Sequence, residues 1–193
     1  MMKLYHGTNV AFDRLDPARS RSGLDFGCGS YLTPDIEQAW GMARRKQMVF
    51  GGRRIVMEFD FDDSCLHDAA SGCLVFEGYN EDWTAFVLRN RNRAWNFKHT
   101  YHVISGPVAD GVMPTVIDEY LEAFPDEAEA LNRDNLSVLT GKLLFRRRES
   151  RQFCFHTQDS IDNYLKYITS LTNFISFIGI PCTTLINNIC SGS

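Results

Sequence analysis

The chain has 193 residues, a formal net charge of -4 and 44% hydrophobic residues, among them 14 Phe. This composition provides the apolar side chains of a sizeable core and argues against a disordered chain. The acidic balance excludes a general electrostatic attraction to nucleic-acid backbones. Basic residues still cluster locally, at 44–46, at Arg89, Arg91 and Arg93, and at 146–151. Such runs are most often solvated surface, but they leave a specific nucleic-acid partner open.

The six cysteines form neither a CxxC pair nor a regular framework, and the first residues lack the apolar stretch of a signal peptide. We therefore expect a reduced protein in the cytoplasm. Cys65, His67 and Cys73 are residue types that bind zinc, but no fourth ligand is evident. No metal is expected.

The predicted elements begin with a short strand at 3–8, a long polar surface loop at 13–29 and a second short strand at 30–33. A helix should follow, with Thr33 as its cap and Pro34 at its first position. Apolar residues then recur at helical spacing as far as Ala43, and a basic run follows them.

The rest of the chain mixes strands and helices without regular alternation, which predicts an α+β fold. Tyr101–Ala109 contains a Gly-Pro interruption, so it should lie at a sheet edge or carry a bulge. The other predicted elements are a half-buried strand at 54–61, an irregular segment at 63–78, helices at 81–91, 115–124, 127–140 and 159–167, and a strand at 151–157. In that last strand, Phe153 and Phe155 should face opposite to Gln152, Cys154 and His156.

Two regions are predicted, a domain at 1–167 and a tail at 168–193. The tail has no charged side chain, and it is about long enough to cross a bilayer. Its Thr, Ser and Asn residues and its Gly-Ile-Pro break argue against that. We expect a docked tail or a surface for a partner protein, and no membrane association.

Several fragments stand out when they are taken in order. Each is weak alone, because a lone strand histidine is usually structural and paired glycines often serve a tight turn. The fragments are His6-Gly7-Thr8, residues 25–33 with the sequence Asp-Phe-Gly-Cys-Gly-Ser-Tyr-Leu-Thr, Gln38-Ala39-Trp40, residues 83–91, residues 101–110, and Gln152-Phe153-Cys154-Phe155.

In these fragments the sequence resembles the ADP-ribosyltransferase clan, in the His-Tyr-Glu branch shared by diphtheria toxin and the poly(ADP-ribose) polymerases. It is most similar to a family of small bacterial proteins grouped in that clan as a domain of unknown function. The resemblance covers about residues 3–167. Ser30 stands where that family usually has Phe, and His102 replaces a common Asp.

The resemblance implies a split β-sheet core with flanking helices and NAD as co-substrate. His6, Tyr31 and Gln152 would be the catalytic residues. His6 would hold the adenosine ribose, Gly7 would offer main-chain groups to the nicotinamide carboxamide, and Tyr31 would stack on the nicotinamide ring. Further cofactor contacts are expected from Thr8, Ser30, Thr33 and Arg19, with Arg21 beside Arg19 on the loop.

Gln152 stands where many relatives have Glu. A glutamine keeps an acceptor oxygen but lacks the charge and basicity of a carboxylate. Mono-ADP-ribosylation of an intrinsically nucleophilic acceptor is then favoured over polymer growth. Glu149 is a poorer candidate, because three residues along a strand place it on the opposite face.

We therefore expect a mono-ADP-ribosyltransferase that modifies a protein or nucleic-acid acceptor. The compact chain and uncharged tail suggest a toxin or effector with a neutralising antitoxin partner. Two alternatives remain open. One is an inactive module that binds NAD or ADP-ribose, favoured by the missing glutamate. The other is a cysteine hydrolase that uses Cys154 and His156, although no third orienting residue is evident.

Overall fold

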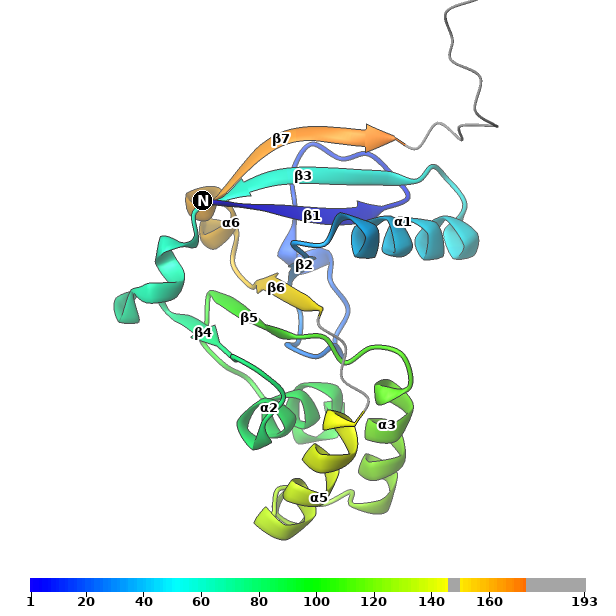
Figure 1. Ribbon diagram of the computed structural model, residues 1–193, viewed down its shortest axis with the longest axis vertical. Helices are drawn as coiled ribbons and strands as arrows, with labels where there is room; N and C mark the ends of the chain where they lie inside the picture. Colours follow the sequence, from blue (N-terminus) through cyan, green and yellow to red (C-terminus); the bar gives the residue numbers. More distant parts are fainter. Residues whose placement is uncertain (146–149, 173–193) are drawn as a thin grey trace, which may run out of the picture.

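The computed structural model describes residues 1–145 and 150–172, and it has an α+β fold built on two sheets (Figure 1). The first sheet has three antiparallel strands in the order β1-β3-β7. These strands are β1 (Met2–Thr8), β3 (Ile55–Phe61) and β7 (Leu165–Thr172). The predictions for β1 and β3 are thus correct to within one residue at each end.

The second sheet has four strands in the order β2-β6-β5-β4, and only the β4–β5 pair is parallel. They are β2 (Ser30–Leu32), β4 (Cys73–Val75), β5 (Val103–Pro107) and β6 (Arg151–Phe155). The two sheets meet at one bridge, in which Tyr5 of β1 and Thr33 exchange main-chain hydrogen bonds of 2.8 and 3.0 Å. Among the described residues β1 and β2 share no further ladder pair, and we call this place the corner where the two sheets part.

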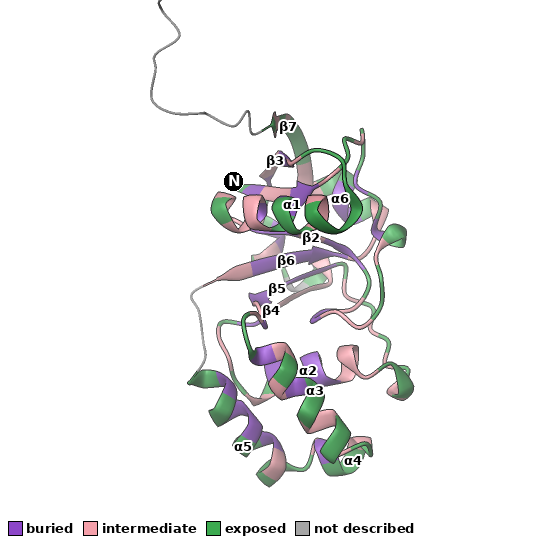
Figure 2. Cartoon of the chain, turned by 90° about the vertical axis from the view of Figure 1, so that its right-hand side faces the viewer, coloured by how far each residue is buried: buried purple, intermediate pink, exposed green. Residues whose placement is uncertain are grey.

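Six α-helices flank the sheets within the described residues. Helix α1 packs against the first sheet, while α2, α3, α4 and α5 gather on the far side of the second sheet (Figure 2). Their bounds are α1 (Ile36–Phe50), α2 (Glu81–Arg91), α3 (Met113–Ala123), α4 (Glu127–Ala130), α5 (Arg133–Leu144) and α6 (Gln158–Tyr164). None of these helices is long and apolar enough to cross a membrane.

Buried side chains form three layers. One lies between the two sheets, one between the second sheet and the helices around α2, and a small one between α1 and the first sheet. Strand β6 contributes Phe153 and Phe155 to the first layer and Cys154 to the second. The predicted alternation of β6 is therefore confirmed.

Helix α1 begins two residues later than predicted. Its cap is Asp35, whose Oδ1 accepts from the main-chain N–H groups of Glu37 and Gln38. Carboxylates are strong caps at this position. The Thr33 hydroxyl accepts from the N–H of Asp35 instead, so Thr33 precedes the helix.

Four further predictions are corrected. The segment 63–78 contains β4 and two 3₁₀ turns, Asp63–His67 and Ala69–Ser71. The predicted helix 127–140 is divided into α4 and α5 around Asn132, whose side chain caps α5. The strand with the Gly-Pro pair is an interior strand, which the sheet tolerates because Pro107 is its last residue.

The fourth correction concerns the C-terminal part of the domain. The helix predicted to reach Tyr167 ends at Tyr164, and the chain continues as the edge strand β7. Strand β7 therefore runs across the boundary predicted at 167/168. The remainder of the predicted tail, 173–193, and the alternative carboxylate Glu149 lie outside the described residues.

Candidate functional site

The His6 side chain extends from β1 at the place where the two sheets part. Its Nδ1 lies 2.8 Å from the main-chain oxygen of Tyr31 on β2. A carbonyl oxygen only accepts, so Nδ1 carries the proton, and Nε2 of the neutral ring is an acceptor. Burial and the nearby Lys46 ammonium lower the pKa of His6 to about 4, although the bond to Tyr31 opposes them. The imidazole is neutral at pH 7.

Lys46 on α1 reaches the same corner. Its Nζ donates to the Gly7 carbonyl at 2.8 Å and lies 3.4 Å from His6 Nε2. Burial lowers the pKa of Lys46. The sequence alone does not distinguish Lys46, which is the last of three basic residues in a run. Its position on the inward side of α1 distinguishes it from the exposed Arg44 and Arg45.

The main-chain groups of Gly7 point toward the parting of the sheets. Tyr5 directs both its N–H and its C=O at Thr33, away from β3. Strand geometry repeats every two residues, so Gly7 directs its own N–H and C=O to the same side. These groups therefore take no part in the pairing of β1 with β3, and the C=O accepts from Lys46.

A second reason for glycine at position 7 is the close approach of α1. A Cβ added there would overlap the carbonyl oxygen of Ala39 and lie 2.8 Å from the main-chain nitrogen of Ala43. The missing side chain thus serves helix packing directly. Space for a ligand is not needed to explain it.

Tyr31 contacts the loop that precedes it. Its hydroxyl donates to the Gly27 carbonyl at 2.8 Å and accepts from the Phe26 N–H at 3.0 Å. The ring is partly buried, stacks on Phe26 at 6.5 Å, and packs against the core around α2. Burial raises the pKa of Tyr31 well above that of free tyrosine. Tyr31 therefore contributes to the packing of the core as well as to the strand.

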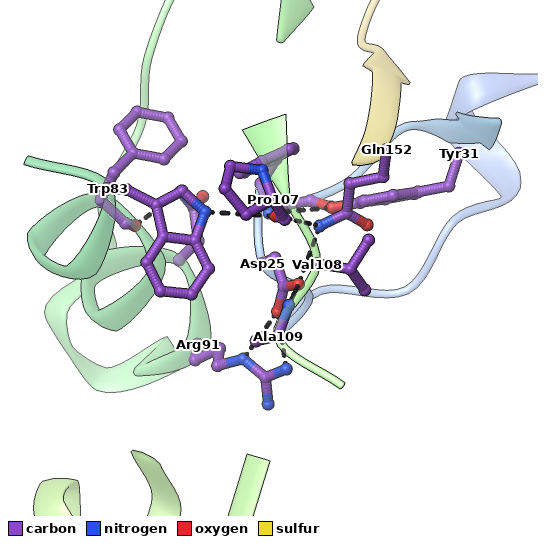
Figure 3. A network of polar contacts seen from close by, with 12 residues as sticks. Asp25, Tyr31, Trp83, Arg91, Pro107, Val108, Ala109 and Gln152 are labelled. Carbon is purple, nitrogen blue, oxygen red and sulfur yellow. Dashed lines mark hydrogen bonds and ion pairs between the residues drawn. The ribbon is translucent and has the colours of Figure 1, made fainter. Parts of the chain in front are cut away.

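Gln152 lies in a buried polar network (Figure 3). Its Nε2 donates to Asp25 Oδ2 at 2.8 Å and to the Pro107 carbonyl at 3.2 Å. Asp25 also accepts from the Ala109 N–H and pairs with Arg91 through Nε and Nη2, at 2.9 and 2.6 Å. Both members of the ion pair are largely buried.

The network fixes which way the Gln152 amide is turned. Asp25 and Pro107 present only acceptors, so the NH₂ group must face them. In Figure 3 the side-chain oxygen of Gln152 points away from Asp25. A glutamate at this position would put a second carboxylate against Asp25. A glutamine at this position is thus matched to the network, whereas the glutamate expected from the resemblance would not be.

The network also explains why the sequence fragments occur together. Asp25, Arg91, Pro107 and Gln152 come from four different fragments, and Trp83 joins them by donating to the Pro107 carbonyl at 3.2 Å. The fragments drew attention to these residues, but no sequence pattern assigned a role to Asp25 or Arg91. Their partners lie 66 and 127 positions away along the chain.

The other predicted cofactor residues differ in their surroundings. Ser30 and Thr8 are buried, and the Thr8 hydroxyl donates to the Val10 carbonyl. The Thr33 hydroxyl lies 3.1 Å from the Arg151 carbonyl and 2.5 Å from Gln38 Oε1, so it ties β2 to β6 and α1. Arg19 is exposed on the loop and pairs with Asp16 at 3.5 Å. Arg21 is exposed as well.

The three proposed catalytic residues lie around β2. His6 touches the main chain of Tyr31, and Gln152 reaches the Asp25–Gly27 turn that also holds the Tyr31 hydroxyl. The imidazole and the Gln152 amide make no direct hydrogen bond. Arg19, Ser30 and Thr8 take no part in these contacts.

The cysteine–histidine pair has poor geometry for catalysis. Cys154 Sγ is 4.0 Å from His156 Nδ1, and that nitrogen lies 2.7 Å from the Cys28 carbonyl. Burial raises the pKa of the Cys154 thiol well above its usual value, which opposes formation of a thiolate. Within residues 1–145 and 150–172, no group of three or more His, Cys, Asp or Glu side chains could hold a metal ion.

The comparisons with known proteins give one match. Residues 2–167 match the model of a family described as "Protein of unknown function (DUF3990)". No significant match was found among curated proteins or among solved structures. Because the match covers most of the chain, the protein belongs to the DUF3990 family.

Proposed function

We propose that the protein is an NAD-dependent mono-ADP-ribosyltransferase with the split-sheet core of that clan. It would release nicotinamide and transfer ADP-ribose to a protein or nucleic-acid acceptor. The observation that carries the proposal is the corner where β1 and β2 part. There, a neutral His6 with an acceptor Nε2 lies beside outward-facing main-chain groups of Gly7 and the Tyr31 strand.

In this reaction the bond between the anomeric carbon of the ribose and nicotinamide breaks, and its electron pair leaves with the nicotinamide. The acceptor's lone pair forms the new bond to that carbon, and the acceptor's proton passes to water or to the acceptor's own base. The transition state is expected to resemble an oxocarbenium ion, as in glycoside cleavage. The protein's task is to orient the dinucleotide and to hold its ribose hydroxyls.

Each residue has a role that fits its contacts. His6 Nε2 would accept from a ribose hydroxyl, and the N–H of Gly7 would bind the carboxamide oxygen of nicotinamide. Lys46 would leave the Gly7 carbonyl free for the carboxamide NH₂ and turn toward the pyrophosphate. The Gln152 oxygen would accept from a ribose hydroxyl while its NH₂ stays on Asp25.

A second candidate function is favoured by the Gln152 network. The amide is buried and bonded to two acceptors, and it has no charge to stabilise an oxocarbenium ion. A module that binds NAD or ADP-ribose without turnover would not need a charged group at this position. The two candidates share a ligand and differ in chemistry.

One experiment distinguishes the transferase from the binding module. Purified protein is incubated in a host lysate with NAD⁺ that is labelled in its adenylate phosphate. Transfer of label with release of nicotinamide supports the transferase, and His6→Ala should abolish both while Arg44→Met, an exposed charge removed from the outer side of α1, should not. Binding of NAD⁺ by calorimetry without nicotinamide release would favour the module. Failure to bind NAD⁺ at all would refute both.

We further propose that the protein acts as a toxin or effector and is held inactive by an antitoxin partner. Induced expression of the wild type should slow growth of the host, and His6→Ala should relieve the effect. Normal growth at high expression of active enzyme would contradict this role.

A further inference from the structure

A hollow of about 580 Å³ lies beside Gly27 and Cys28. Its walls come from the loop before β2, the segment that runs from the end of α2 to His99, and His156 after β6. A hollow of this size accommodates a small organic ligand. None of the residues proposed for the NAD⁺ site lines it.

The walls are cationic although the whole chain is acidic. Arg89, Arg93 and Lys98 line the hollow, and none of its lining residues is Asp or Glu. Arg89 pairs with Glu127, but within the described ranges Arg93 and Lys98 have no carboxylate partner. Arg91, which lies between Arg89 and Arg93 in the sequence, instead pairs with the buried Asp25. The basic cluster noted in the sequence is therefore divided between a structural ion pair and this hollow.

Two histidines in the wall have buried nitrogens without a partner in the described part of the chain, His99 Nδ1 and His156 Nε2. Their rings are 4.5 Å apart and nearly perpendicular. The other nitrogen of each faces a main-chain carbonyl, so it carries the proton. Burial lowers the pKa of both rings, that of His156 to about 4. Each unpartnered nitrogen is then a hydrogen-bond acceptor that requires a donor.

Phe97 adds an aromatic surface to the hollow, with the Arg89 guanidinium 5.5 Å from its ring centroid. The lining thus combines cations without a carboxylate partner, an aromatic ring and two orphan acceptors. A phosphate would pair with the cations, and a planar base would stack on the aromatic ring. An amino or hydroxyl group would donate to the two acceptors.

We propose that this hollow binds a nucleoside monophosphate group, carried by a free nucleotide or by the end of a nucleic-acid strand. The phosphate would lie against Arg93 and Lys98, and the nucleoside against Phe97 and the two histidines. The proposal is independent of the transferase assignment, because no residue is shared with the His6 corner.

Calorimetry with AMP, adenosine, inorganic phosphate and a 5′-phosphorylated trinucleotide tests it. AMP or the trinucleotide should bind, and their relative affinity identifies the source of the group. The double variant Arg93→Met, Lys98→Met should weaken binding about tenfold to a hundredfold, as expected for loss of charge-assisted hydrogen bonds. Arg44→Met is the matched control for charge and should leave the affinity unchanged.

His99→Phe keeps a ring in the wall and removes an acceptor, so it should weaken AMP binding severalfold with little effect on inorganic phosphate. Thermal unfolding of each variant checks that the fold is retained. AMP is also part of NAD⁺, so each titration is repeated in His6→Ala, which disables the proposed NAD⁺ corner. Binding of AMP that remains in His6→Ala and is lost when Arg93→Met and Lys98→Met are added belongs to the hollow, which separates the two proposals. Equal binding of inorganic phosphate and AMP, or wild-type affinity in the double variant, would overturn this one.

Discussion

The His6 corner and the Asp25 network contrast in how completely their polar groups are used. In the network, Asp25 accepts from three different residues and the Gln152 NH₂ faces two acceptors. At the corner, the one polar contact of His6 Nε2 among the described residues is a long one to Lys46, and Gly7 directs main-chain groups away from its sheet. A ligand can exchange for a flexible lysine at the corner, whereas entry into the network would break buried hydrogen bonds.

Removing one partner of the network should have the largest effect. Arg91→Met leaves the Asp25 carboxylate buried without its counter-charge and should lower the free energy of unfolding by about 3–5 kcal/mol. Urea denaturation measures the change. Arg44 is exposed and pairs with no carboxylate among residues 1–145 and 150–172, so Arg44→Met should stay within about 0.5 kcal/mol of the wild type. Similar values for the two variants would show that the network adds little stability.

The next effect is expected at the packing of α1 on β1. Gly7→Ala forces a methyl group against the backbone of α1 and should cost about 1–3 kcal/mol through overpacking. The matched control is Gly41→Ala on the same helix, where a Cβ meets nothing and helix propensity should add up to about 1 kcal/mol. A neutral Gly7→Ala in thermal unfolding would mean that α1 shifts without cost.

Gln152→Glu tests the match between amide and carboxylate. The variant loses a hydrogen bond to a charged group, which should cost about 1.5–3 kcal/mol at pH 7. Repulsion from the Asp25 carboxylate should raise the folded-state pKa of the introduced carboxyl group. Its stability is therefore highest below the unfolded pKa of Glu, near 4.3, and falls as pH rises through the folded value.

The free energy of unfolding of Gln152→Glu should therefore be lower than that of Gln152→Met at pH 7, and this difference should shrink as the pH is lowered. Unfolding curves of the two variants between pH 4 and 7 provide the check. A deficit that does not change with pH would indicate that the introduced carboxylate leaves the network and reaches solvent.

At pH 7 the smallest effect is expected at the corner, because the contribution of His6 to stability changes only as the pH falls. His6 should titrate near pH 4 by NMR, below the usual 6.5, and Lys46→Met should move the midpoint upward only in part, because burial is the larger cause. Since the folded pKa is depressed, His6 contributes stability that is present above pH 6.5 and is lost as pH falls toward 4. In His6→Asn, the free energy of unfolding should fall less steeply between pH 6.5 and pH 4 than in the wild type. A midpoint of 6.5 in the wild type would place His6 in solvent.

Local sequence predicted the local structure well. Helix α2 matches its predicted range, because its apolar positions and basic end lie within the segment and its cap, Asn80, directly precedes it. Strand β7 was missed, since its partner β3 is about a hundred residues away and its exposed face shows no apolar pattern. Pairing across such distances leaves little trace in a single segment.

The same limit applies to the site. His6 and Tyr31 could be placed on neighbouring strands from the fragments, and their contact agrees with that placement. The roles of Asp25 and Lys46 depend on how α1, α2 and the loop before β2 pack together. A carboxylate in a polar loop and a lysine in a basic run have no sequence pattern that separates them from surface residues.

The close approach of α1 to Gly7 has an evolutionary consequence. The carbonyl of Ala39 and the nitrogen of Ala43 are the atoms that a side chain at position 7 would meet, and both alanines are fully buried. Enlarging position 7, 39 or 43 alone would push the helix outward and carry Lys46 away from His6. Homologous sequences should therefore covary at these three positions, and relatives with a bulkier trio should also have lost the lysine.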